Sequence, residues 1–151
     1  MLQQARDVLA VAPKTSDTEI EFRFSIPGQL FDQAHSHWRT WANCAKDPVD
    51  SLVLCNNDSD LRCVDGNWER KRVVDFVRLP IAGKLSTRLC VSVESAAAPP
   101  SHPECWCIRR RRRRWTYSFP SWDVVWTLVD SRGEIEIEFT GEPLQLVDSE
   151  S

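Results

Sequence analysis

The sequence predicts an all-β domain with one or two helices, arranged as an eight-stranded antiparallel closed β-barrel. Segments with the composition of strands are separated mostly by short stretches of turn-forming residues, and short connections favour antiparallel neighbours. Apolar and charged residues also alternate with a period of two near both ends, in residues 19–24 and 134–139. Closing such a sheet into a barrel would remove the edges that it otherwise exposes.

The strands are placed by β-branched and aromatic residues between turn signals such as residues 65–67 and 131–133. They are expected at about residues 18–25, 51–55, 61–65, 70–79, 84–94, 105–118, 121–130 and 133–140. A helix is predicted between the first two, because apolar residues from Phe31 to Ala45 recur at helical spacings. His35 and His37 lie two positions apart and cannot share a helical face, so we expect them on the surface rather than on a metal.

The 151 residues are enough for one domain, which we expect to span residues 18–141. Residues 1–17 are expected to form a flexible lead-in, and residues 142–151 an acidic tail. No run of about 18 apolar residues is present, which excludes a membrane-spanning helix. The N-terminus also lacks the basic-then-apolar order of a secretory signal.

The six cysteines are scattered along the sequence, and without a secretory signal we interpret them as reduced thiols in the cytosol or nucleus. A zinc site could be built from His102, Cys105 and Cys107, but no second matching pair of ligands accompanies them. We therefore favour packing or chance for these residues.

Net charge is only −3, yet the charges are strongly segregated along the sequence. Residues two apart in a strand project from one face with backbones about 7 Å apart, so the glutamates of each end strand can converge. These are Glu19 and Glu21 in the first strand, and Glu134, Glu136 and Glu138 in the last. Carboxylate oxygens are preferred ligands of Mg²⁺ and Mn²⁺, and crowding them without a cation is costly.

A run of arginines supplies the opposite charge. Arg110, Arg112 and Arg114 share one face of a strand, and guanidinium groups clamp phosphate oxygens in a fork geometry. Taken singly, each glutamate strand is more typical of a solvated face, and the arginine run of a nuclear-import or nucleic-acid patch. Their occurrence together favours a site for a divalent metal ion and a polyphosphate.

These residues resemble the metal-dependent mRNA 5′-triphosphatases of fungi and protozoa, in the triphosphate tunnel metalloenzyme superfamily. The resemblance covers about residues 18–140. It rests on an opening motif (Glu19, Glu21, Arg23), a basic residue six positions before a glutamate (Arg88, Glu94), the basic strand at residues 110–114, Trp122 with Thr127, and the closing Glu134, Glu136 and Glu138. Residues 72–75 are also similar to the family.

The resemblance implies the triphosphate tunnel fold and a set of roles. Glu19, Glu21 and Glu138 would bind Mg²⁺ or Mn²⁺, and Glu94 and Glu136 would position or activate the attacking water. The phosphate ligands would be Arg88, Arg110, Arg112 and Arg114, of which Arg112 and Arg114 also act in catalysis. Arg23, Glu134 and Thr127 would support them.

Some positions depart from the family. Asp123 and Val125 stand where a basic residue and an acid are usual, Ser25 replaces a glycine, and Ser86 replaces an acid. The metal-binding wall is intact while part of its support is altered, which puts full activity in doubt.

By resemblance, the protein removes the γ-phosphate from the 5′-triphosphate end of nascent RNA, the first step of mRNA capping, in the nucleus. The implied partners are the RNA end, the capping guanylyltransferase and a second copy in a homodimer, without a membrane. An alternative enzyme is a tunnel phosphatase acting on nucleoside triphosphates, inorganic triphosphate or thiamine triphosphate. An alternative that is not an enzyme is a non-catalytic barrel similar to a Mediator head subunit, serving as an interaction module. The five end-strand glutamates favour the enzyme, and Asp123 and Val125 favour the scaffold.

Overall fold

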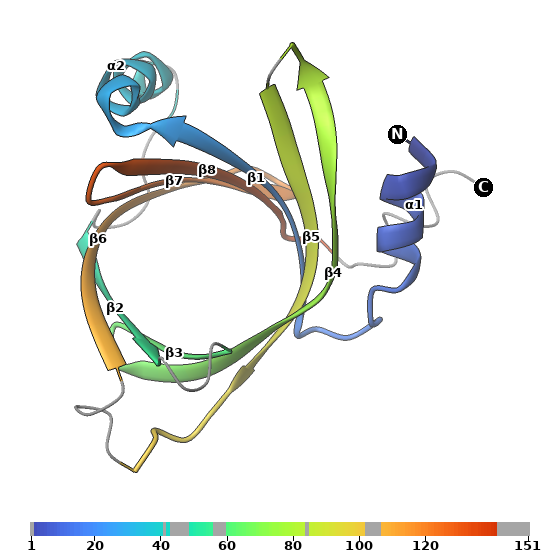
Figure 1. The fold of residues 1–151 in the computed structure, drawn as a ribbon, viewed down its shortest axis with the longest axis vertical. Coiled ribbons are helices and arrows are strands. Elements are labelled where there is room, and N and C mark those ends of the chain that lie inside the picture. Colours follow the sequence, from blue (N-terminus) through green and yellow to red (C-terminus); the bar gives the residue numbers. More distant parts are fainter. Residues whose placement is uncertain are drawn as a thin grey trace.

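The computed structural model describes residues 2–40, 42, 49–55, 60–83, 85–101 and 107–141 (Figure 1). Its strands are β1 (Thr18–Pro27), β2 (Val49–Cys55), β3 (Leu61–Val64), β4 (Asn67–Ala82), β5 (Leu85–Ala96), β6 (Cys107–Ser118), β7 (Trp122–Val129) and β8 (Arg132–Phe139). Its helices are α1 (Leu2–Ala10) and α2 (Gly28–Arg39). The predicted mostly-β class with helices is confirmed, and each predicted strand coincides with an observed one.

The strands pair in the ring order β1-β5-β4-β3-β2-β6-β7-β8, and β8 pairs with β1 to close a barrel. All neighbouring pairs are antiparallel. Closure places the first and last strands of the domain side by side, with Glu21 opposite Glu138 and Arg23 opposite Glu136. The two glutamate strands, far apart in the sequence, thus form one wall.

The hydrophobic core lies outside the barrel, because the inward faces of its strands carry the charged residues. One cluster packs α1 onto the outer faces of β1, β4 and β5, and its buried members are Val8, Ile20, Leu79, Leu89 and Val91. A second packs α2 onto β6 and β7, through Phe31, Trp115, Tyr117 and Trp126. Figure 1 shows both helices on the outside of the ring.

The alternation predicted for β8 is seen in this packing. Ile135 contacts the cluster under α2, and Phe139 contacts the cluster under α1. The glutamates that alternate with these apolar residues point into the barrel, where they line its cavity; they are Glu134, Glu136 and Glu138. One face of the strand therefore stabilises the fold while the other is left for chemistry.

The expectation of a flexible lead-in at residues 1–17 is wrong for its first part. Residues 2–10 form α1, and Val8 is only 4% exposed where it meets the barrel. A helix this short is marginal alone, so its order depends on the apolar surface that β4 and β5 present. The predicted acidic tail at residues 142–151 lies outside the described residues.

The predicted surface position of His35 is also wrong, whereas His37 is exposed as expected. His35 is buried in the α2 cluster, and its Nε2 lies 2.7 Å from the Tyr117 hydroxyl. Burial disfavours the imidazolium form and lowers the pKa of His35 to about 4. Helix α2 ends at Arg39, and most of the further predicted extension to Ala45 lies outside the described residues.

Gly28 allows α2 to start close to the β7–β8 turn. Its N–H donates to the Ser131 carbonyl over 3.1 Å, and a Cβ at this position would collide with that carbonyl oxygen. Among the described residues, Cys63 and Cys90 are buried free thiols. The zinc candidates His102 and Cys105 lie outside the described residues. In the part of the chain that the structure describes, no helix is long and apolar enough to cross a membrane.

Candidate active site

The barrel encloses a cavity of about 730 Å³ to which every strand contributes side chains. The charged residues lining it are Glu19, Glu21, Arg23, Arg62, Glu69, Lys71, Glu94, Arg110, Arg112, Arg114, Asp130, Arg132, Glu134, Glu136 and Glu138. An adjoining cavity of about 560 Å³ shares Glu19, Glu69, Glu94 and Glu138 with it. The acids of the predicted site therefore line one charged cavity.

The acidic wall is built on the paired strands β1 and β8 and is held by Arg23. The Arg23 guanidinium lies 2.9 Å from Glu21, 3.7 Å from Glu136 and 3.9 Å from Glu134. Glu21 is only 2% exposed. Burial, followed by the charge of Glu136, raises the pKa of Glu21 because both disfavour its carboxylate form. Arg23 therefore contacts three of these acids, and its supporting role stays a prediction.

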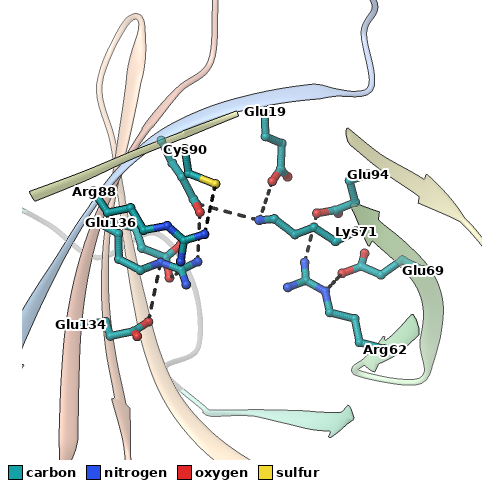
Figure 2. A network of polar contacts seen from close by, with 11 residues as sticks. Glu19, Arg62, Glu69, Lys71, Arg88, Cys90, Glu94, Glu134 and Glu136 are labelled. Carbon is teal, nitrogen blue, oxygen red and sulfur yellow. Dashed lines mark hydrogen bonds and ion pairs between the residues drawn. The ribbon is translucent and has the colours of Figure 1, made fainter. Parts of the chain in front are cut away.

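Two cations that the sequence analysis missed complete this wall (Figure 2). Lys71 Nζ on β4 lies 2.6 Å from Glu19 Oε2 and 3.9 Å from Glu21 Oε2. Arg62 on β3 lies 2.5 Å from Glu69 and 3.0 Å from Glu94. The only sequence signal is the alternation of Glu69 and Lys71 with Arg70 and Arg72 in β4, which does not say which pair faces inward.

The pKa values show that these cations compensate the acids unevenly. Burial opposes the ionisation of Glu19, but the charges of Lys71 and Arg62 and hydrogen bonds to Glu94 and Lys71 together lower the pKa of that carboxyl. Burial and hydrogen bonds to Glu19 and Glu69 raise the pKa of Glu94 to about 8, despite its contact with Arg62. Burial and the charges of Glu19 and Glu21 raise the pKa of Glu138 to about 7. Negative charge on this wall is therefore costly, and a further cation would favour the carboxylate forms of Glu94 and Glu138.

The predicted metal ligands Glu19, Glu21 and Glu138 lie on this wall. Their carboxylate oxygens suit Mg²⁺ or Mn²⁺ chemically. A cation would also offset the repulsion by Glu19 and Glu21 that helps to raise the pKa of Glu138. Within the described residues, however, no three acidic, histidine or cysteine side chains are arranged so that they could hold one ion. Glu19 and Glu21 are arranged around the ammonium of Lys71 instead. The metal site remains a prediction.

The basic wall follows the predicted alternation along β6. Arg110, Arg112 and Arg114 line the cavity, whereas Arg111 is exposed and Arg113 stacks on Trp115, 4.9 Å from the ring centroid. Arg112 is only 8% exposed. Alternate arginines therefore project into the barrel, as a period of two requires.

Two buried polar atoms on the same wall point to an oxygen-rich ligand. Arg114 is paired with Thr127 across β6 and β7, and both side chains line the cavity. Arg114 Nε and Thr127 Oγ1 are buried and have no hydrogen-bond partner among the described residues. Buried polar groups are nearly always satisfied, so a bound anion or water is expected at this point.

Other predicted residues lie differently. Arg88 is outside the lining of the cavity; its guanidinium sits over the Phe76 ring at 4.3 Å and contacts Cys90 Sγ at 3.8 Å. Val125, which departs from the family pattern, is 1% exposed and paired with Glu136 across β7 and β8. An apolar side chain therefore borders the acidic wall where the family has an acid.

Solved structures share this fold. Schizosaccharomyces pombe Pct1 RNA triphosphatase in complex with the Spt5 CTD is 16% identical, with a TM-score of 0.66 over 97% of this chain and 80% of that chain. A second structure of S. pombe Pct1 RNA triphosphatase is 14% identical, with a TM-score of 0.63 over 92% and 79% of the two chains. The S. pombe Mediator head module has a TM-score of 0.52 at 8% identity, over 88% and 90%.

No protein-family model and no curated protein matches the sequence. At such low identities the solved structures establish a shared fold, and they confirm the resemblance to RNA triphosphatases at that level. These structures do not assign roles to individual residues of this chain.

Proposed function

We propose that this protein is a divalent-metal-dependent RNA 5′-triphosphatase that removes the γ-phosphate from nascent transcripts. The observation that carries the proposal is the joint lining of one cavity by the three alternate arginines of β6 and the glutamates of β1 and β8. A triphosphate needs cations along its oxygens and acids near the attacked phosphorus, to hold a metal and orient water. The fold shared with an RNA triphosphatase supports the same activity.

The residues of the cavity suit separate tasks. Arg110, Arg112 and Arg114 bind the phosphate oxygens, and Arg112 and Arg114 stabilise the charge that develops on the transferred phosphoryl group. Thr127 donates its unpaired hydroxyl to the same anion. The ion pair between Arg23 and Glu134 keeps the acidic wall in place.

Glu94 and Glu136 orient the attacking water and accept its proton. With its pKa near 8, Glu94 must lose its proton to act as a base, and cations entering the site favour that loss. Glu19, Glu21 and Glu138 would hold Mg²⁺ or Mn²⁺, which would neutralise phosphate oxygens. In cells the reaction would take place in the nucleus beside the capping guanylyltransferase.

Release of phosphate from γ-labelled triphosphate-ended RNA tests this proposal. We expect release with Mg²⁺ or Mn²⁺ and none after chelation. Glu136→Gln should lower the rate by roughly a hundredfold, the scale of losing one acid–base or electrostatic group, without loss of folding. Asp32→Asn, on the exposed face of α2, is the matched control and should retain the wild-type rate.

Parallel assays with ATP and inorganic triphosphate identify the preferred substrate. If phosphate were released faster from ATP or inorganic triphosphate than from RNA, the protein would still be a phosphatase, but RNA would not be its preferred substrate. Full turnover after chelation would contradict the metal requirement.

A non-catalytic interaction module is the second candidate. The buried Val125 beside Glu136 and the similarity of fold to the Mediator head module favour it. A folded protein that releases no phosphate from RNA, ATP or inorganic triphosphate would establish this alternative over the enzyme.

A further inference from the structure

Lys71 reaches across the barrel wall to neutralise acids of a strand that is not its neighbour. Strand β5 separates β4 from β1 in the ring, yet the Lys71 ammonium lies 2.6 Å from Glu19 and 3.9 Å from Glu21 (Figure 2). Its side chain is only 16% exposed, and a cation so shielded from water depends on charged partners to remain ionised. The contact is therefore a specific ion pair within the cavity.

A metal ion bound at the predicted site would need oxygens of the same two carboxylates, Glu19 and Glu21. Two cations beside these carboxylates repel each other strongly, because like charges a few ångströms apart are only partly screened in a shielded site. The described residues provide no three-ligand metal arrangement while Lys71 is in place. The lysine and the metal are thus alternatives on one wall.

We propose that Lys71 is a tethered counter-ion that occupies the acidic wall in the metal-free protein and must withdraw when a divalent cation binds. The inference rests on the metal site of the proposed function and does not require hydrolysis. Lysine suits this role, because its ammonium is a compact charge on a flexible four-carbon stem and can move without a change in the backbone. Its displacement opposes metal binding, so it weakens the affinity of the protein for divalent ions.

The withdrawn ammonium remains inside the tunnel. Lys71 lines the same cavity as Arg112 and Arg114, so after leaving Glu19 it adds one positive charge to the surface available to a polyphosphate. Metal binding thereby prepares the cavity for an anion, and the free protein keeps its acids paired.

Titration of the metal-free protein with Mn²⁺, followed by calorimetry and by the electron paramagnetic resonance of free Mn²⁺, tests this role. Lys71→Met should bind Mn²⁺ roughly tenfold more tightly than wild type, because the competing charge is gone. Lys71→Gln should show the same gain, and it keeps a hydrogen-bond donor for Glu19 if the methionine variant folds poorly. Arg72→Met is the matched control: it removes the same charge from the adjacent, exposed position and should bind Mn²⁺ like wild type.

Each outcome separates this inference from the proposed activity. Equal or weaker Mn²⁺ binding by both Lys71 variants would overturn it, as would an equal gain in Arg72→Met. Absence of Mn²⁺ binding in every variant would overturn it together with the proposed metal site. If the Lys71 variants bound Mn²⁺ more tightly but the wild-type protein released no phosphate, the counter-ion role would be supported and the hydrolase activity rejected.

Discussion

Individual carboxyl groups in the cavity make the stability of the metal-free protein depend on pH. The pKa of Glu138 is raised to about 7 and that of Glu94 to about 8, both primarily because burial disfavours the charged form. Between the ordinary glutamate pKa and these values, the folded state binds more protons than the unfolded state. These two carboxyl groups therefore lower the free energy of unfolding as pH rises through this window, whereas His35, with its pKa lowered to about 4, acts in the opposite direction up to about pH 6.5.

Replacement of Glu138 isolates its share of the effect. Glu138→Gln removes an ionisable group from the acidic wall, so the variant should melt at a higher temperature than wild type at pH 8 and show a smaller loss of stability between about pH 5 and 7. Thermal melts by circular dichroism in a chelator measure both. Glu94 contributes to the slope that remains between about pH 7 and 8. Superimposable profiles would show that Glu138 is solvated rather than crowded.

At the scale of elements, β6 separates two functions by residue parity. Its inward arginines belong to the cavity, while Trp115 and Tyr117 on its other face anchor α2. Arg112→Ala should therefore reduce phosphate release by roughly a hundredfold, as expected for a key electrostatic group. Arg111→Ala, one position away on the exposed face, should retain most activity. Equal losses in the two variants would indicate a flexible basic patch instead of an ordered strand.

Helix α1 is the element whose order depends most on packing against the barrel. Val8→Asp buries an unpaired carboxyl against Leu89 and Val91 and should destabilise the protein by about 3 kcal/mol, measured by urea unfolding. Leu2→Asp, at a position 76% exposed on the same helix, should change stability by less than about 0.5 kcal/mol. If Val8→Asp were as stable as wild type, α1 would not be docked in solution.

At the scale of the whole molecule, the barrel has its charges inside and its core outside. A small eight-stranded barrel usually fills its interior with packed side chains, but here the lumen holds acids and arginines around a cavity of about 730 Å³. The apolar outer faces then need covers, which α1 and α2 provide at separate places. The helices are consequently the elements that allow the interior to serve a polar ligand.

Much of this arrangement could be predicted from the sequence, because the period of a strand assigns residues to faces. The alternation of glutamates in β1 and β8 and of arginines in β6 identified many of the charged side chains that line the cavity, and turn residues located the strands. Each of these inferences depends only on neighbours within a few positions.

Tertiary structure alone decided the features that depend on residues distant in the chain. Helix α1 packs against β4 and β5. His35 is buried where it forms a hydrogen bond with Tyr117, 82 positions away in the sequence. The strand order and register of the ring place Lys71 beside Glu19 and Arg62 beside Glu94. Local periodicity determines which face a side chain occupies, but the charge and burial that it meets there are set by the strands that closure brings beside it.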